Sequence, residues 1–395
     1  MPRILHLGVG NFFRAHLADY TQSCPDWRIT GVSFRSPTVR DGLKGNGYAY
    51  ALVIKDAHGT EIKQITALDE MLVLSEDPQA ILTAMRDPEV AVISLTVTEK
   101  AYHLNGAGHL DLAAPAIVAD LSGGALTPVG ALARGLVART TPVTVLCCDN
   151  LPENGRKLEA AVAAFAHAAG LSLLADVTYP ATMVDRITPA TTDDIRAEAG
   201  DDMAVPTEAF SEWVVEDRFA AARPDWPGVQ WVDDVAPHEM RKLRMLNGAH
   251  SYLAYAGTLR GHTFVHEAVG DPVLRAGAQQ LMEEAAATLP PSVQAQAADY
   301  TKALLDRFDN PNLHHRLRQI AMDGSQKMPI RIVATLKDRA GAHSPALHNA
   351  VAAWCAFVQA DVAAGRALDD PMADQIATAC QSGDPDAALR TLIGA

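Results

Sequence analysis

The segment Ile4-Leu5-His6-Leu7-Gly8-Val9-Gly10 is a short apolar run that ends in glycines, and a helix-compatible pattern follows it over residues 12–20. This order predicts a strand that turns directly into a helix. In a dinucleotide-binding fold the first glycine permits the tight turn, and the second lets the backbone approach a pyrophosphate at the helix N-terminus. Phe13 stands where the usual third glycine lies, so an ordinary strand–helix turn is the alternative interpretation. The candidate cofactor-binding residues of this turn are Gly8, Gly10, Asn11 and Phe12.

Strand-like and helix-like segments alternate along the first half of the chain. The strand-like runs are residues 27–34, 90–97 and 143–148, with 48–53 as a further candidate in an antiparallel excursion, and the helix-like segments include 77–85 and 124–139. This alternation predicts a mostly parallel sheet covered on both faces. From about residue 237 the chain becomes alanine-rich with helical spacing, as in 272–289, 292–308, 345–364 and 371–380. We therefore expect an α/β, Rossmann-like domain over residues 1–233 and a mainly helical domain over residues 234–395.

The composition is that of a soluble globular protein. The 395 residues exceed one ordinary core, and the net charge of −14 argues against a nucleic-acid surface as the main function. No apolar run approaches the ~20 residues of a membrane span. The first three residues lead directly into an apolar run, which leaves no room for a secretory signal. Five cysteines without Cys-x-x-Cys spacing favour structural thiols in a reducing cytoplasm, and they support neither a zinc site nor disulfides.

Four polar side chains share one face of a predicted helix over residues 239–250. At about 100° per residue they fall within less than half the circumference, together with two leucines. A lysine on such a face is a candidate proton acceptor, because desolvation would lower its pKa towards neutrality. A solvated stripe, with Glu239 paired to Lys242, is the alternative interpretation. The candidate catalytic residues here are Glu239, Lys242, Asn247 and His250.

Several motifs, in this order, resemble those of the polyol-specific long-chain dehydrogenase/reductase family, which includes mannitol dehydrogenases. Its two most specific elements are Lys-x4-Asn-x2-His, at residues 242–250, and Cys-Asp-Asn-Leu-Pro-x-Asn-Gly, at residues 148–155. The other matching segments are residues 8–16, 94–100, 183–189, 207–208, 213–219 and 323–327. Among the members of the family, the fructuronate reductase branch is the one that the sequences of residues 32–36 and 323–327 resemble most.

The resemblance implies a metal-independent hydride transfer between a secondary alcohol and a nicotinamide. Lys242 would take the hydroxyl proton during oxidation and return it during carbonyl reduction. Asn150 and Asn247 would hydrogen-bond the reacting oxygen, His250 would orient the substrate, and Glu239 would modulate the charge of the lysine. The position of Asn150 after a predicted strand agrees with this role, because open α/β sheets bind ligands at the carboxyl ends of their strands.

The cofactor preference is less clear from the residues. Arg35 stands at the end of the second strand, where the acidic residue that binds the ribose hydroxyls of NAD is missing. It could accommodate a 2′-phosphate, stack on adenine, or be an ordinary surface arginine. We expect NAD, with NADP as the alternative, and no metal. Thr98 and Glu99 are candidate cofactor contacts, with Glu99 either near the nicotinamide or relaying protons to solvent.

Two further residues are candidate substrate contacts. Asp185, followed by Arg186, either lines the domain cleft or belongs to a structural ion pair. Lys327, near Asp323, either binds a uronate carboxylate or is an ordinary charge at a capped helix terminus. Other candidate partners of that carboxylate are Arg316, Arg318 and Arg331. We expect Glu216, Asp217 and Arg218 to form a domain-interface salt-bridge network, and His314 and His315 to be solvated.

The sequence thus predicts a cytoplasmic NAD(P)-dependent oxidoreductase with its active site in the cleft between the two domains. The first hypothesis for its reaction is the interconversion of fructuronate and mannonate, and the second is the oxidation of mannitol or another polyol. A non-catalytic dinucleotide-binding sensor is the alternative from a different class. The expected partners are a small sugar acid or polyol, with no nucleic acid and no membrane, and the chain is expected to be a monomer or a small homo-oligomer.

Overall fold

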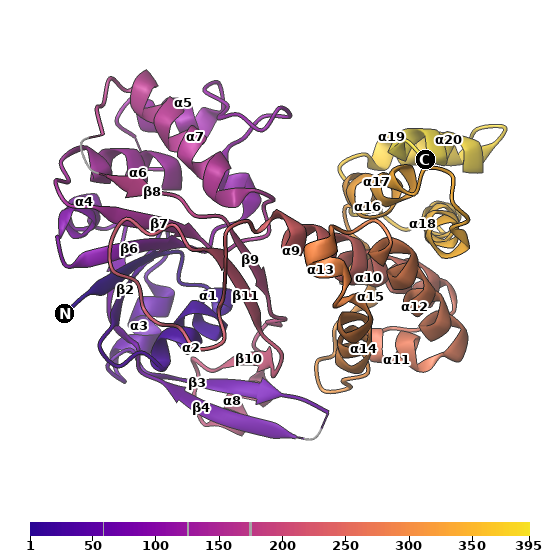
Figure 1. Cartoon of the computed structure of the whole chain (residues 1–395), viewed down its shortest axis with the longest axis horizontal. Helices are drawn as coiled ribbons and strands as arrows, with labels where there is room; N and C mark the ends of the chain where they lie inside the picture. The colour runs from indigo at the N-terminus through magenta and orange to yellow at the C-terminus, as the bar shows by residue number, and fades with distance from the viewer. Residues whose placement is uncertain (58, 125, 174–175) are drawn as a thin grey trace. The chain divides into compact units, whose positions relative to one another are not determined.

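The computed structural model describes residues 1–57, 59–124, 126–173 and 176–395, and it divides into two compact units, Met1–Ala236 and Pro237–Ala395 (Figure 1). Unit 1 contains every sheet of the described chain, and unit 2 consists of helices. Among the described residues, no helix has both the length and the apolar character needed to cross a membrane.

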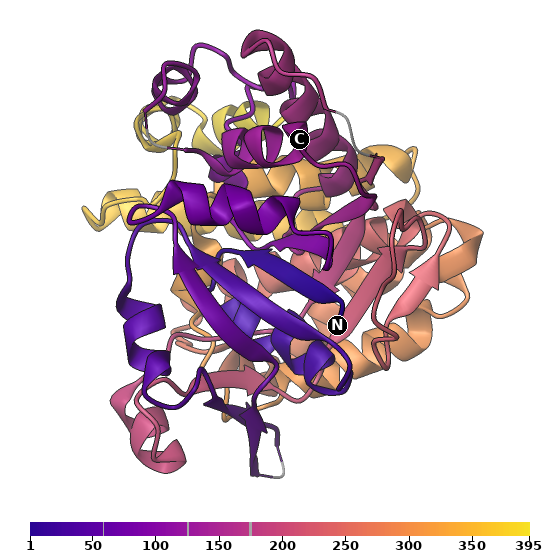
Figure 2. The same cartoon turned by 90° about the vertical axis from the view of Figure 1, so that its left-hand side faces the viewer.

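The main sheet of unit 1 has six strands (Figure 2). They are β1 (Arg3–Leu7), β2 (Arg28–Ser33), β5 (Leu68–Val73), β6 (Val90–Leu95), β7 (Val143–Cys147) and β8 (Val177–Thr178). Their spatial order is β5-β2-β1-β6-β7-β8, and every pair is parallel. Numbered along the sheet's own strands, this is the order 3-2-1-4-5-6 of the dinucleotide-binding α/β fold.

Both faces of this sheet are covered, because successive side chains of a strand point to opposite sides. Leu5, Ile93 and Val145 join one apolar cluster with the helices α4 (Pro78–Arg86), α6 (Pro128–Val137) and α7 (Asn154–Ala168). Their neighbours Ile4, Val92 and Leu146 join a second cluster, with α1 (Asn11–Ala15) and α2 (Leu17–Gln22). The strand β6 is buried at every position, as expected for a central parallel strand.

Two three-stranded sheets complete unit 1. One has the order β10-β3-β4, from β3 (Tyr50–Lys55), β4 (Thr60–Ile65) and β10 (Val205–Glu208). The other has the order β12-β11-β9, from β9 (Thr182–Asp185), β11 (Glu212–Glu216) and β12 (Gln230–Val232). The remaining elements are α3 (Thr38–Lys44), η1 (Glu99–Tyr102), α5 (Pro115–Leu121) and α8 (Asp193–Ala199).

Unit 2 packs its helices around one apolar core. They are α9 (Ala236–Arg241), η2 (Lys242–Leu246), α10 (Asn247–Leu259), α11 (Val265–Gly270), α12 (Pro272–Ala286), α13 (Pro291–Gln294), α14 (Ala297–Phe308), α15 (Leu317–Ala321), α16 (Gly324–Met328), η3 (Pro329–Val333), α17 (Ala334–Asp338), α18 (Pro345–Ala363), α19 (Ala373–Cys380) and α20 (Pro385–Ile393). The helix α10 lies at the centre and contacts α12, α15 and α18. Both η2 and η3 are π-helices.

The predicted fold class is confirmed, with a parallel sheet followed by helices, and the antiparallel excursion exists as β3 and β4. Three predicted helices were wrong in detail. The helix over 12–20 breaks at His16, whose ψ of −90° is not helical, and the helix over 292–308 divides into α13 and α14. The α-helix over 239–250 contains the π-helix η2. Residue 125, in the segment predicted to be helical over 124–139, lies outside the described residues.

Candidate functional site

A cavity of about 640 Å³ lies at the carboxyl ends of β1, β6 and β7 in unit 1. The segments that follow these three strands line it, at the edge where open α/β sheets bind their ligands. The lining residues are Gly10, Asn11, Phe12, Thr96, Val97, Thr98, Glu99, Lys100, Cys148, Asp149 and Asn150. Of the predicted site residues, Gly10, Asn11, Phe12, Thr98, Glu99 and Asn150 therefore gather here.

The glycine turn has the geometry that close approach of a ligand requires. Gly8 has a φ of +105°, and a Cβ at this position would lie 2.3 Å from the carbonyl oxygen of Thr96. A Cβ on Gly10 would meet no atom within 4 Å. Gly10 is the N-cap residue of α1, and no side-chain hydrogen bond caps that helix in the described part of the chain. The first N–H groups of a helix have no intrahelical partner, so this end is suited to an anion such as a pyrophosphate.

A buried histidine ties the glycine turn to the neighbouring strand. His6 lies 2.8 Å from the hydroxyl of Ser94 through Nδ1 and 2.9 Å from the hydroxyl of Thr96 through Nε2. Thr96 donates to the carbonyl of Gly8 at 2.6 Å, and the ring of His6 stacks on Phe13 with centroids 3.8 Å apart. The role of His6 could not be predicted, because one histidine in an apolar strand gives no distinctive signal in the sequence.

The burial of His6 predicts a pH-dependent stability. Desolvation lowers the pKa of His6 from 6.5 to about 3, and a hydrogen bond that its ring donates to the carbonyl of Gly8 opposes this shift. Below pH 6.5 the unfolded chain binds a proton that the folded chain does not, so His6 alone should reduce the free energy of unfolding by about 1.4 kcal/mol per pH unit down to about pH 3. Urea unfolding between pH 7.5 and 4.5 should give a smaller loss for His6→Gln than for the unsubstituted protein. Equal losses would contradict this assignment.

The loop that presents Asn150 is held by its motif neighbours. Asp149 accepts hydrogen bonds from the hydroxyl of Tyr102 and from the backbone N–H of Leu151 (3.0 Å). Asn154 donates to the carbonyl of Thr182 and accepts from its N–H, both at 3.0 Å. Burial raises the pKa of Asp149, although the hydrogen bonds oppose this shift. Most of the motif over 148–155 therefore holds the loop after β7 in place. This structural role of Asp149, Asn154 and Tyr102 was not predicted.

In unit 2 the π-helix changes the relation between Lys242 and Asn247. The N–H of Asn247 donates to the carbonyl of Lys242, five residues back, instead of to a carbonyl four residues back. The two residues thus stand one turn apart along the helix, whereas a regular α-helix would separate them by about 140°. The angular positions predicted on an α-helical wheel do not hold across this turn. π-Turns of this kind occur frequently at functional sites.

His250 lies in a cluster of rings further along α10. Its ring is 4.6 Å from that of Phe308 and meets His315 edge to face at 5.5 Å. Burial, followed by the charges of His315, Arg307 and Arg331, lowers the pKa of His250 well below its usual value, so the ring is neutral near pH 7. His315 is half-buried instead of solvated as predicted, and burial lowers its pKa to about 4. His314 is exposed, as predicted.

The comparisons with known proteins cover both units. The family model of the mannitol dehydrogenase Rossmann domain matches residues 2–228, and that of the mannitol dehydrogenase C-terminal domain matches residues 234–392. The chain belongs to the mannitol dehydrogenase family. It is therefore an oxidoreductase of a family of NAD(P)-dependent dehydrogenases that act on the CH–OH groups of polyols and sugar acids. The family that the sequence motifs predicted is confirmed.

Individual relatives include enzymes named for both substrate classes. D-mannonate oxidoreductase of Escherichia coli K12 is 40% identical over 94% of this chain and 83% of its own length. Mannitol 2-dehydrogenase of Pyrenophora tritici-repentis is 36% identical over 96% of this chain and 74% of its own length. The solved structure of Pseudomonas fluorescens mannitol 2-dehydrogenase, a ternary complex with NAD and D-mannitol, matches with a TM-score of 0.83 at 31% identity, over 100% of this chain and 91% of that chain.

The remaining predicted cofactor residues differ in their surroundings. Gly8 does not line the cavity but shapes the turn below it. Arg35 follows β2, is exposed and also lies outside the cavity lining. Asn11 lines the cavity, while its side chain donates to Thr191 (3.2 Å) and accepts from Arg14 (2.7 Å). Asn11 thus helps to hold the start of α1, in addition to any ligand contact.

Several predicted charges have structural partners within their own unit. Arg186 pairs with Asp19, whereas the prediction considered a pair with Asp185. Asp185 itself is buried in β9. Glu216 lies 3.3 Å from Arg218 and accepts from the N–H of Ala181. These contacts, and the pair of Asp217 with Arg223, join residues of unit 1, and a network across the domain interface stays a prediction.

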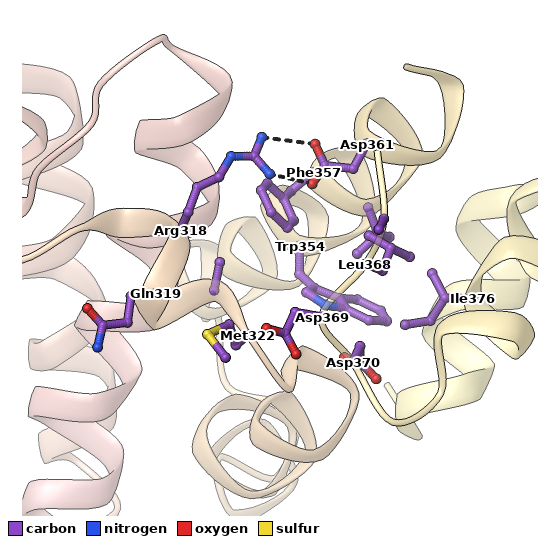
Figure 3. Close-up of a pocket in the computed structure, with 13 residues that line it drawn as sticks. Arg318, Gln319, Met322, Trp354, Phe357, Asp361, Leu368, Asp369, Asp370 and Ile376 are labelled. Atoms are coloured by element: carbon purple, nitrogen blue, oxygen red, sulfur yellow. Dashed lines mark hydrogen bonds and ion pairs between the residues drawn. The ribbon is translucent and has the colours of Figure 1, made fainter. Parts of the chain in front are cut away.

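Three of the cations considered for a substrate carboxylate also have defined contacts. Lys327 donates to the carbonyls of Ile320 (3.3 Å) and Met322 (2.6 Å) at the end of α15. Arg316 lies over the ring of Phe264 at 5.2 Å. Arg318 forms two hydrogen bonds to Asp361, at 2.7 and 3.0 Å (Figure 3). This pair borders a second cavity of about 340 Å³, which Trp354 also lines.

Among the described residues, no group of three or more His, Cys, Asp and Glu side chains is placed to hold a metal ion. All five cysteines are free thiols.

Proposed function

We propose that this chain interconverts a keto sugar acid and its hydroxy acid, of the fructuronate and mannonate type, with NAD as cofactor and Lys242 as general acid and base. The observation that supports the reaction type best is the cavity at the ends of β1, β6 and β7, where an uncapped helix N-terminus and Asn150 lie together. The 40% identity to D-mannonate oxidoreductase supports the sugar-acid substrate.

The residues of unit 1 fit a dinucleotide. The positive φ of Gly8, the open space beside Gly10 and the uncapped start of α1 leave room for a pyrophosphate to approach the protein backbone. When bound, NAD would supply the acceptor of the hydride. Glu99 and Thr98, which line the same cavity, are proposed as contacts of the cofactor. NADP is the alternative, and Arg35 is the residue whose replacement would test it.

Residues of the chain would transfer the hydroxyl proton and stabilise the negative charge on the reacting oxygen. In oxidation of the hydroxy acid, Lys242 takes the hydroxyl proton as the C–H hydride leaves, and in reduction it returns that proton to the new alkoxide. Asn150 and Asn247 donate hydrogen bonds to the reacting oxygen, which becomes more negative in the transition state. The neutral ring of His250 orients a substrate hydroxyl, and Glu239 tunes the charge of the lysine. No step requires a metal ligand from this chain.

A substrate comparison tests this proposal. NADH oxidation should be fastest with fructuronate, slower with tagaturonate and slowest with fructose. Progress is measured at 340 nm under identical conditions, with NADPH as a parallel cofactor. Inactivity with both sugar acids would refute the substrate proposal. The relatives named mannitol 2-dehydrogenase favour the second candidate, a polyol dehydrogenase, which predicts fructose as the best substrate instead.

We further propose that the protein acts in the cytoplasm, which agrees with its free thiols, as a monomer or small homo-oligomer.

A further inference from the structure

Two π-helices contact each other in unit 2. One is η2, which contains Lys242, and the other is η3, which contains Arg331. π-Helices make up well under 1% of residues in globular proteins and are frequent at functional sites. The start of α10 also approaches η3 closely, because a Cβ on Gly248 would lie 3.5 Å from the side chain of Ile332 and 3.8 Å from the carbonyl of Arg331. The fold therefore holds η3 against the helix of the proposed catalytic residues.

Arg331 extends along the first turn of α10. Its Nη1 lies 3.4 Å from the carbonyl oxygen of Asn247 and 3.2 Å from the hydroxyl of Ser251. Its charge also acts on His250, together with that of Arg307. The proposed substrate-orienting residue thus lies near two guanidinium groups. A guanidinium group forms stronger hydrogen bonds with an anion than with a neutral sugar.

The other cations considered for this role are held elsewhere. Lys327 serves the end of α15, Arg316 lies over Phe264, and Arg318 is paired with Asp361. Arg331 is the one of these four whose described contacts are with the Asn247 segment itself. A guanidinium also suits a carboxylate, because it can form two parallel hydrogen bonds with it.

We propose that Arg331 binds the carboxylate of the substrate and thereby selects sugar acids over neutral ketoses and polyols. This inference rests on the proposed function and adds the residue that determines the substrate class. The contact of Arg331 with the backbone of Asn247 would couple carboxylate binding to the position of a proposed oxyanion donor.

The test compares Arg331→Gln with the unsubstituted enzyme on fructuronate and on fructose. The ratio of kcat/KM between the charged and the neutral substrate should fall roughly ten- to hundredfold, as expected for the loss of a charged hydrogen-bonding partner. Arg331→Lys keeps the positive charge but cannot form two parallel hydrogen bonds with a carboxylate, so the ratio should fall by a smaller factor. Arg318→Gln is the matched control, and it should leave the ratio unchanged.

Competitive inhibition by mannonate and by mannitol gives a second readout that does not depend on turnover of the neutral substrate. Inhibition by mannonate should weaken in Arg331→Gln, whereas inhibition by mannitol should not. An unchanged ratio, or an equal loss with both substrates, would overturn the inference while the proposed function stands. Inactivity of the unsubstituted enzyme with every sugar acid would overturn the proposed function and the inference with it.

Discussion

Replacement of Lys242 by alanine is expected to lower kcat by about 10²- to 10⁴-fold, because this is the usual contribution of a positioned general acid or base. NADH binding should be retained, since the proposed cofactor site belongs to unit 1 and contains no atom of Lys242. Steady-state rates of NADH oxidation and titration of NADH fluorescence measure the two quantities separately. A variant that keeps more than about a tenth of kcat would refute the role of Lys242 in proton transfer.

Lys242→Arg is the informative control. Arginine keeps a positive charge but cannot release a proton in the accessible pH range. If the lysine acted only through its charge, the arginine variant would remain active, whereas the proposed mechanism predicts that it is nearly as slow as the alanine variant. In the oxidative direction, the rate of the unsubstituted enzyme should rise with pH as Lys242 loses its proton, and neither variant should show that rise. A dinucleotide-binding sensor would instead bind NADH alike in all three proteins and turn over none of the substrates.

Gly8→Ala is expected to be the most damaging small substitution in unit 1. The positive φ of +105° disfavours any side chain, and the new Cβ would lie 2.3 Å from a backbone carbonyl. Backbone strain and overpacking together should lower the free energy of unfolding by roughly 2–6 kcal/mol. Urea unfolding followed by circular dichroism measures this loss. Stability equal to that of the unsubstituted protein would show that the turn is not packed against Thr96 as described.

Gly10→Ala, two residues further along the same turn, is expected to affect NADH binding without a large effect on protein stability. Its φ of −95° is accessible to alanine, and its Cβ would meet no atom within 4 Å. The free energy of unfolding should therefore change by less than about 1 kcal/mol, the usual cost at a helix N-cap. Because Gly10 lines the cavity, the methyl group should nevertheless weaken NADH binding. Unchanged affinity for NADH would argue against a pyrophosphate at this turn.

Much of the fold could be predicted from the sequence because its signals are local. Glycines after an apolar run mark the turn from β1 to α1, and alternating buried segments mark a parallel sheet. The site was harder to predict, because its support comes from residues distant in sequence. The contact of Tyr102 with Asp149 and that of Arg331 with Asn247 join segments 47 and 84 residues apart. No periodicity in one strand or helix reveals such pairs.

The π-turn at η2 was missed for a different reason. Its residues, Lys-Leu-Arg-Met-Leu, are good α-helix formers, so their propensities favour the commoner helix. The wider turn packs against α12 and η3. Helix propensities describe single residues and do not predict such packing.

The wider turn at η2 also has a consequence for the direction of the proposed catalytic side chains: the helix gives up its regular hydrogen bonds, and Lys242 and Asn247 come to share a face. A regular α-helix over the same residues would replace this wide turn with the usual hydrogen bonds to the carbonyl four residues back. The amine of Lys242 and the amide of Asn247 would then face different sides of the helix, and they could not both bind the same oxygen atom.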